Sequence, residues 1–294
     1  MFKSKNKMHP RNVFRTQPDY IALAIKHKDF RMICKLELNG KVIPNYKNDN
    51  ALRTLTETLL KEYFNLKIEI APGNLIPTVP LRLNYILWLE DLLTKINVKD
   101  VKGIDIGCGS SCIYALLGAK KNWQMTALES NSVNLEYAKK NIEANNMQQL
   151  ISLFAQPNKD VIFKNFFQTC PDDMKFHFSM CNPPFYNSSL SNPFNGTTRK
   201  SKKRPPPRNC TTGNMEELAC PGGEVKFVER IVEESLLYSE RIMIFSSMLG
   251  HKSSVSQVQE ILKKIDIKHI ATTEFHQGNT TRWCIAWSFS DNML

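Results

Sequence analysis

The residue types best suited to chemistry stand together in one tetrad, Asn182-Pro183-Pro184-Phe185. The tetrad directly follows FHFSMC, an apolar run with the composition of a buried strand. Its two prolines remove two backbone donors and stiffen the turn, so nearby carbonyl groups are free to accept hydrogen bonds from a substrate. The Asn182 side chain adds a carbonyl acceptor, and Phe185 adds a flat apolar face. This combination fits an amine attached to a planar conjugated group.

An amine of that kind is a poor nucleophile because its lone pair is delocalised. Two acceptors that bind its hydrogens favour the pyramidal, nucleophilic form, and no strong base is needed until the proton is lost. The tetrad therefore predicts activation of an exocyclic amine. The alternative interpretation is a rigid loop with a buried Phe185 and an Asn182 cap.

A second candidate site is the run IDIGCGSS, residues 104–111, which ends one expected strand and opens a helix. Gly107 and Gly109 let the backbone approach a ligand closely. Glu129 follows Gly107 by 22 residues, at the end of the next expected strand, where a carboxylate can accept both hydroxyls of a ribose. Cys112 replaces the third glycine of the dinucleotide fingerprint, which argues against NAD. The alternative is a structural turn with an exposed Glu129.

The elements that position these residues alternate between strands and helices from Val101 onward, as is typical of a parallel α/β sheet. FHFSMC is the fourth strand of that series. Beyond the tetrad the pattern predicts helices over 223–239 and 252–264 and strands over 241–247, 268–275 and 282–289. We divide the chain into a basic arm (1–17), an N-terminal accessory region (18–75) and an α/β core (76–290).

Within the accessory region, the pattern predicts strands over 31–38 and 66–70 and a helix from 48–50 to about 64; the core begins with a helix over 81–96. Residues 187–222 are rich in Ser, Asn, Pro, Gly and Lys and have no periodicity. A stretch of that length without regular structure is expected to be a functional loop or disordered.

The charge is concentrated in two segments. The chain carries 39 Lys and Arg against 28 Asp and Glu, a net charge of +11. Five basic residues within 1–15 and six within 199–208, with no acid among them, account for all of that excess. Basic segments on a neutral body favour binding to nucleic acid, because they displace counterions from phosphates. The alternative is a solvated tail together with a nuclear localisation signal in RKSKKRPPPR.

Composition excludes several other classes. With 294 residues and 42% hydrophobic residues, the chain can bury a sizeable core. No apolar run approaches the roughly 20 residues of a membrane span, and residues 1–15 lack the apolar region of a secretory signal. The eight cysteines show no CxxC spacing and no clustered histidine, so we expect reduced intracellular thiols and no metal site.

The tetrad resembles that of class I S-adenosylmethionine-dependent methyltransferases that act on exocyclic amines. Similar tetrads mark DNA and RNA adenine N6-methyltransferases, but also glutamine-amide and guanine N2-methyltransferases. Residues 8–289 are similar to one family, the U6 small nuclear RNA adenine N6-methyltransferases, also called methyltransferase-like protein sixteen. The segments that carry this resemblance are MHPRN (8–12), LIPTVPLRLNYI (75–86), GIDIGCGSSCIY (103–114), MCNPPF (180–185), RPPP (204–207) and TEFHQGNTTRW…AWSF (273–289).

The resemblance implies a class I Rossmann-like fold with a mainly parallel seven-stranded sheet, and S-adenosyl-L-methionine as cofactor. Arg82 would contact the methionine carboxylate of the cofactor, and Glu129 would hold its ribose. Asn182 would bind the target amine with help from the Pro183 carbonyl, and Phe185 would stack on the base. The full set of implied catalytic residues is Asn182, Pro183, Pro184 and Phe185. The implied cofactor-binding residues are Arg82, Asp105, Gly107, Gly109, Ser111, Glu129, Asp160 and Asn182.

The family resemblance also implies an RNA hairpin as partner, gripped by the arm and by the 187–222 loop. The implied RNA-binding residues are Arg11, Arg15, Lys47, Arg199, Lys200, Lys202, Lys203, Arg204 and Arg282. Targets would be an adenosine in a UACAGAGAA-like sequence of U6 RNA and of messages for S-adenosylmethionine synthetase. Asn279 stands where the family usually has an arginine, and the C-terminal RNA-binding region of larger members is missing from these 294 residues. A monomer in the nucleus, and also in the cytoplasm, is expected.

Two other functions stay open at this point. A protein glutamine or guanine N2-methyltransferase would use the same tetrad, although a peptide substrate needs no basic arms. An RNA-binding protein that has lost turnover would keep the fold, although an intact glycine loop and tetrad speak against it. Loss of function on changing Asn182, or only on changing Lys202, Lys203 and Arg204, would separate the enzyme from the binding protein.

Overall fold

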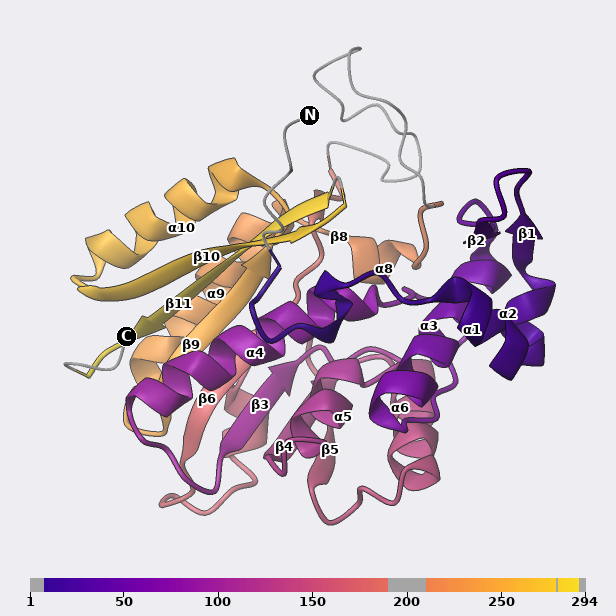
Figure 1. The fold of residues 1–294 in the computed structure, drawn as a ribbon. Coiled ribbons are helices and arrows are strands. Elements are labelled where there is room, and N and C mark those ends of the chain that lie inside the picture. Colours follow the sequence, from indigo (N-terminus) through magenta and orange to yellow (C-terminus); the bar gives the residue numbers. More distant parts are fainter. Residues whose placement is uncertain (1–7, 190–209, 279, 291–294) are drawn as a thin grey trace.

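The computed structural model describes residues 8–189, 210–278 and 280–290. At its centre lies a seven-stranded sheet in the order β10-β11-β9-β6-β3-β4-β5 (Figure 1). The five strands from β9 to β5 are parallel, and β11 is antiparallel to both of its neighbours. The predicted mainly parallel seven-stranded sheet is therefore confirmed. The strands are β3 (Lys102–Ile106), β4 (Gln124–Glu129), β5 (Ile151–Ala155), β6 (Phe176–Cys181), β9 (Ile242–Leu249), β10 (His269–Gln277) and β11 (Thr280–Ser288).

Helices cover both faces of the sheet, because its strands are apolar on both sides. One apolar cluster joins the sheet to α4 (Val79–Lys95), α5 (Ile113–Ala119) and α6 (Ser132–Ala144). The other joins it to α7 (Lys164–Phe167), α9 (Gly223–Leu237) and α10 (Lys252–Lys264). Successive residues of a strand face opposite sides, so Ile104 and Ile106 belong to the second cluster while Asp105 faces the first.

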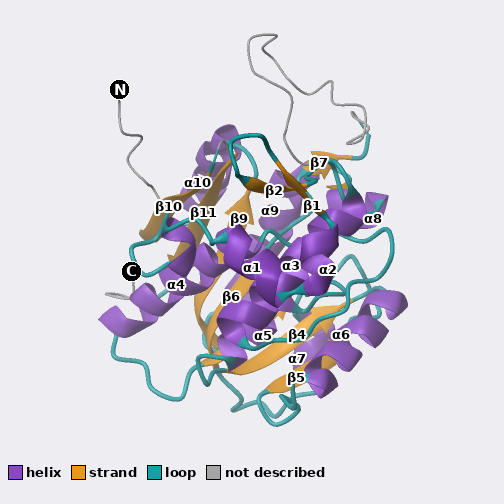
Figure 2. Ribbon diagram, turned by 45° about the vertical axis from the view of Figure 1, so that its right-hand side comes forward, coloured by secondary structure: helices purple, strands orange, loops and turns teal. Residues whose placement is uncertain are grey.

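The N-terminal region packs against α4, and its one separate apolar cluster within the described residues is small, made of Leu52, Ile70 and Ile76. It consists of a short 3-10 helix, Val13–Arg15, then α1 (Tyr20–Lys26), α2 (Lys28–Met32), β1 (Cys34–Leu36), β2 (Val42–Pro44) and α3 (Asp49–Phe64). Phe14, Leu60 and Leu66 share one apolar cluster with the sheet. In Figures 1 and 2, α1, α2 and α3 lie together on the side of the molecule away from β10 and α10.

The helix predicted from 48–50 to about 64 is confirmed, and Asn48 caps it by accepting a hydrogen bond from the Ala51 N–H. The strand predicted over 31–38 is shorter. Residues up to Met32 continue α2, and only Cys34–Leu36 pairs with β2. Local alternation in this segment did not show where the helix ends.

The strand predicted over 66–70 is wrong, and the reason is visible in its hydrogen bonds. The N–H groups of Lys67 and Glu69 donate to Asn145 Oδ1 (2.8 Å) and Asn141 Oδ1 (2.7 Å). The Nδ2 atoms of the same two asparagines donate back to the Lys67 carbonyl (2.6 Å) and the Glu69 carbonyl (2.8 Å). Side chains of α6 thus take the place of a partner strand.

Residues 210–222 have regular structure, contrary to the prediction for 187–222. They contain α8 (Met215–Leu218) and β8 (Ala219–Cys220), which pairs in parallel with β7 (Tyr186–Asn187). A capping box forms between Asn214 and Glu217 and starts α8. Residues 190–209 lie outside the described part of the chain. Within the described part, no helix is both long and apolar enough to cross a membrane.

The asparagine contacts of α6 give a stability prediction. Asn141 is 1% exposed and also donates to the Ser110 carbonyl, at 2.9 Å. Asn141→Ala leaves the buried Ser110 carbonyl and the partly buried backbone groups of Glu69 without these partners, so we expect a loss of about 2–3 kcal/mol in the free energy of unfolding, measured by urea denaturation. Lys139→Ala, an exposed change on the same helix, should stay within about 0.5 kcal/mol of the wild type. Equal losses in the two variants would contradict this account.

Candidate active site

The predicted site residues meet at the carboxyl edge of the sheet. The strand β3 ends at Ile106, directly before the glycine loop, and Ile106 lies opposite Leu128 of β4 and Cys181 of β6. Glu129 ends β4, and Asn182 follows β6. Three neighbouring strands therefore bring the glycine loop, the acid and the tetrad together, at the edge where α/β sheets bind their ligands.

The glycine loop turns sharply and leaves open space beside it. Gly107 and Gly109 have φ angles of +70° and +63°, in the left-handed region that glycine adopts without strain. The N–H groups of Gly107 and Cys108 both donate to the Leu128 carbonyl, at 2.9 and 3.0 Å. A Cβ atom built on Gly107 would have no atom within 4 Å, so a ligand can come close to the backbone there. Ser111 is buried at the end of this loop.

Glu129 is held by backbone donors and is only 7% exposed, so the alternative of an exposed Glu129 is wrong. One carboxylate oxygen accepts from the Gly109 N–H at 2.8 Å. The other accepts from the N–H groups of Ser130 and Asn131, at 2.8 and 2.9 Å. Since an ionised carboxylate accepts about four hydrogen bonds, about one more can be accepted without loss of these three.

Arg82 and Asp105 are two buried ionisable side chains that have, among the described residues, fewer charged or hydrogen-bonding partners than they could accommodate. The Arg82 guanidinium donates to the Tyr114 hydroxyl at 2.8 Å and approaches the Met248 sulfur at 3.6 Å, and both partners are neutral. Among the described residues no carboxylate forms an ion pair with Arg82. Asp105 is fully buried, and its oxygens have no partner within hydrogen-bond geometry.

Burial raises the pKa of Asp105 to about 7, and the charge of Glu129 adds to the effect. The charge of Arg82 acts in the opposite direction and lowers this pKa. An unpaired guanidinium and an unpaired carboxylate beside an open glycine loop fit a ligand that carries both a carboxylate and a cationic group. A methionine-derived end, with its carboxylate and ammonium, has this chemistry.

The tetrad contains a hydrogen-bond acceptor without a partner, on Asn182, and an aromatic ring held by its neighbours, on Phe185. The buried Asn182 Oδ1 atom has no hydrogen-bond partner. Half-buried Phe185 has the Arg282 guanidinium 4.9 Å from its ring centre. A Cβ atom on Gly250 would lie 2.9 Å from Phe185 Cγ, so a glycine at 250 lets the backbone touch the ring. Burial lowers the pKa of Arg282, and the nearby charge of Arg82 lowers it further.

Two features of the site escaped the sequence analysis. Glu224 is 3% exposed and accepts from the N–H groups of Gly250, at 2.6 Å, and His251, at 3.1 Å, which fixes the turn against Phe185. Glu217 of α8 accepts from the Leu75 N–H at 2.8 Å and lies 3.9 Å from a Cβ position on Gly109. The Asn-x-x-Glu capping box that starts α8 was the available signal for Glu217.

Asp160 is not brought into this cluster. It is exposed on the loop after β5, and its N–H donates to Asn158 Oδ1 at 2.8 Å. In the described part of the chain it forms no hydrogen bond or ion pair with the other predicted cofactor residues. Its neighbour Lys159 forms an ion pair of 3.0 Å with Glu216 of α8.

The predicted RNA-binding residues are distributed widely. Arg11 forms ion pairs with Glu90 and Asp91 of α4, and Asp91 also binds His9 at 2.7 Å. Arg15 and Lys47 are exposed. Arg282 lies at the tetrad instead. The five loop residues of the prediction, Arg199, Lys200, Lys202, Lys203 and Arg204, lie outside the described residues.

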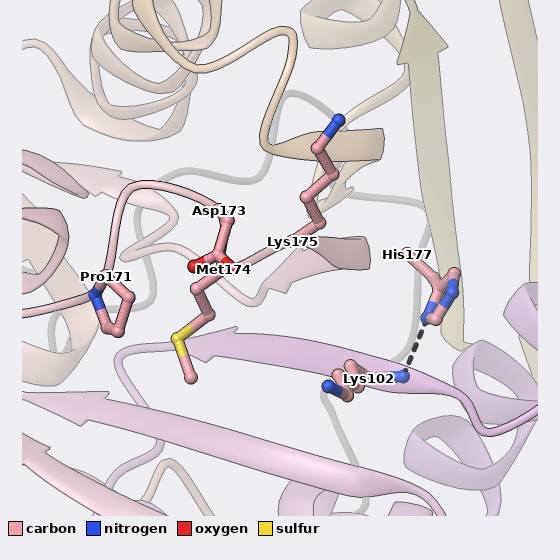
Figure 3. A pocket seen from close by; sticks show the side chains of 6 residues that line it. All are labelled: Lys102, Pro171, Asp173, Met174, Lys175 and His177. Atoms are coloured by element: carbon pink, nitrogen blue, oxygen red, sulfur yellow. Dashed lines mark hydrogen bonds between the residues drawn. The ribbon is translucent and has the colours of Figure 1, made fainter.

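A surface hollow of about 480 Å³ is lined by Lys102, Pro171, Asp173, Met174, Lys175 and His177 (Figure 3). It lies where β3 and β6 begin, at the sheet edge opposite the tetrad. His177 Nδ1 accepts from the Lys102 N–H there, at 2.9 Å. Across the residues that the structure describes, no three His, Cys, Asp or Glu side chains are grouped to hold a metal ion.

Known proteins match this arrangement over almost the whole chain. The model of a family described as RNA methyltransferase matches residues 2–291. The U6 small nuclear RNA (adenine-(43)-N(6))-methyltransferase of Drosophila melanogaster is 56% identical over 288 residues, which are 98% of this chain and 94% of that protein. The RNA N(6)-adenosine-methyltransferase METTL16 of Homo sapiens is 42% identical, over 97% of this chain and 51% of that protein.

Solved structures agree with the fold. The human METTL16 catalytic domain in complex with a MAT2A 3'UTR hairpin has a TM-score of 0.89 and 42% identity, over 97% of this chain and 96% of that one. The N-terminal domain of human METTL16 in complex with SAH has a TM-score of 0.80 and 39% identity, over 97% of this chain and 99% of that one. With a family model that spans nearly every residue and a relative at 56% identity, the chain belongs to the RNA methyltransferase family.

Proposed function

We propose that the chain transfers a methyl group from S-adenosyl-L-methionine to the N6 amine of an adenosine in structured RNA. U6 small nuclear RNA is the proposed target, together with hairpins in messages for S-adenosylmethionine synthetase. The observation that carries this proposal is the buried, unpartnered Asn182 Oδ1 atom beside Phe185, next to the glycine loop. The relatives named for U6 adenine and RNA adenosine methylation, and the neighbour solved with an RNA hairpin, support it.

The residues at the donor end hold the cofactor. It supplies an electrophilic methyl group on a sulfonium. Arg82 would bind its carboxylate, since this guanidinium has only neutral partners among the described residues. Asp105 would face the cationic end, and Glu129 would accept a hydrogen bond from a ribose hydroxyl with its remaining lone pair. Gly107, Gly109 and Ser111 would line the cofactor side of the site, whereas Asp160 is exposed on the loop after β5 and lies outside this cluster.

The residues at the acceptor end hold the base. Asn182 Oδ1 and the Pro183 carbonyl accept hydrogen bonds from the adenine amine, Pro184 stiffens the turn, and Phe185 stacks on the ring. The adenosine must be unpaired or flipped out to reach this depth. Catalysis is then mainly positioning of the amine in line with the methyl group. Arg11, Arg15, Lys47, Arg282 and the basic 199–204 segment bind phosphates around the hairpin.

The predicted organisation and setting are part of the same proposal. The arm over 1–17 and the loop over 187–222 bind RNA, the region over 18–75 supports them, and residues 76–290 carry the chemistry. The enzyme acts as a monomer in the nucleus and also in the cytoplasm. Glutamine or guanine N2 methylation and RNA binding without turnover are the competing functions, and the assay below separates them.

The test of function is methyl transfer from labelled S-adenosylmethionine to a U6 hairpin. We expect N6-methyladenosine, identified by mass after digestion to nucleosides, and a loss of at least about 100-fold in kcat for Asn182→Ala, because the amine loses its acceptor. Phe185→Leu should also lower kcat, whereas Lys139→Ala, on an exposed part of α6, should not. Label in added protein would indicate glutamine methylation, and labelled guanosine would indicate N2 methylation. Tight hairpin binding without any label would leave an RNA-binding protein.

The buried carboxylate of Asp105 predicts a pH dependence of folding. Its pKa of about 7 lies above the ordinary 3.8, so the folded chain binds the proton of the Asp105 carboxyl more tightly than the unfolded chain does. The stability that the protonated carboxyl contributes is complete below pH 4 and is lost as the pH rises to 7. Between pH 5 and 8 the wild type should lose roughly 3 kcal/mol relative to Asp105→Asn, measured by urea unfolding of both proteins. Parallel pH profiles would contradict this prediction.

A further inference from the structure

The end of β6, directly before the tetrad, is paired with a neighbouring strand on one side and unpaired on the other. On the β3 side, the ladder of β6 continues to Cys181, opposite Ile106. On the β9 side, the ladder stops at Ser179, opposite Phe245. The last two residues before Asn182 therefore have no backbone partner on β9. Something other than the sheet must fix the distance between these strand ends.

A chain of side-chain hydrogen bonds fills this gap, and the chemistry of its groups fixes its direction. Ser246 Oγ lies 2.7 Å from the Ser179 carbonyl, which can only accept, so the single Ser246 proton points there. The Tyr85 hydroxyl lies 2.8 Å from Ser246 Oγ and must therefore be the donor of that pair. Its oxygen is then free to accept from the Cys181 N–H, at 3.4 Å. Every proton in the chain has one assigned acceptor.

Tyr85 is well placed to act as a rigid spacer. It is fully buried, and its ring meets the Tyr114 ring edge-on, with centroids 5.5 Å apart. Arg82 precedes Tyr85 by one helical turn on α4, so the two side chains share a face. They contact Met248 and Ser246, which are two residues apart on β9. One face of α4 thus carries the Arg82 guanidinium and, through Tyr85, also contacts the end of β6 before Asn182.

We propose that Tyr85 is a positioning residue for methyl transfer. Its hydroxyl holds the end of β6, and with it Asn182, at a fixed distance from the helix face that carries Arg82. The methyl donor and the amine that accepts the methyl are then aligned by one side chain that touches neither of them. This role rests on the proposed function, because it assigns Arg82 to the donor and Asn182 to the acceptor.

The first experiment measures steady-state methylation of the U6 hairpin by Tyr85→Phe. This change keeps the ring and its packing and removes only the hydroxyl. We expect kcat to fall roughly 10- to 100-fold, as small misplacement of reacting groups does, with KM for S-adenosylmethionine and Kd for the hairpin within about twofold of the wild type. Ser246→Ala should give a similar fall. The double variant should be no worse than the poorer single variant, because both changes break the same chain.

Tyr238→Phe is the matched control, since it removes the hydroxyl of a half-buried tyrosine whose ring stacks on Phe167, 4.6 Å away, remote from the tetrad. We expect its kcat to equal that of the wild type. A kcat of Tyr85→Phe within twofold of the wild type would overturn the proposal. So would a change confined to KM or to hairpin affinity, which would indicate a binding role.

Amide hydrogen exchange tests the same placement without activity. In Tyr85→Phe the Cys181 N–H loses its acceptor, so a peptide over 179–185 should exchange at least about tenfold faster than in the wild type and in Tyr238→Phe. Unchanged exchange would overturn the proposed role of the hydroxyl. If the wild type methylates no RNA, the proposed function fails, and the exchange measurement still decides whether Tyr85 holds the strand end.

Discussion

The burial of Arg82 and Asp105, neither of which forms an ion pair within the described residues, is the constraint on which the site depends. Removing a charge from water is costly unless it gains a partner. The two groups lie on different elements, Arg82 on α4 and Asp105 on β3. Most of the other side chains of both elements are apolar and buried, which keeps these polar groups in place. A ligand with complementary charges removes the cost and therefore stabilises the folded chain as it binds.

Several parts of the fold could be predicted because residues close together in the sequence determine them. The alternation after Val101 predicted the parallel sheet, and Asn48 marked the start of α3. The glycine loop, Glu129 and the tetrad each follow a strand, so their meeting at one edge of the sheet followed from strand direction alone. These predictions needed no knowledge of distant contacts.

Other parts could not be predicted, because distant residues decide them. Nothing in LKIEI shows that its backbone will bond to two asparagines more than 70 residues later. The partners of Arg82 come from α5 and β9. The support of Phe185 comes from Gly250, in a turn that shows no motif of its own, and from Glu224 of α9, which holds that turn. Likewise, Arg11 looked like a phosphate ligand, but Glu90 and Asp91 hold it, and any phosphate must compete with two carboxylates for it.

The attachment of residues 67–69 to Asn141 and Asn145 has a consequence for the order of folding. Residues 67–69 are synthesised before α6, so their backbone groups find these partners only after α6 exists. The Leu75 N–H donates to Glu217, which follows 142 residues later in the sequence, so this bond can form only later still. Contacts of such sequence separation carry a large loop-closure cost and form late. Residues 67–75 can therefore complete their backbone hydrogen bonds only after α6 and α8 have been synthesised, and neighbouring apolar residues stay exposed to solvent or to a chaperone in the interval.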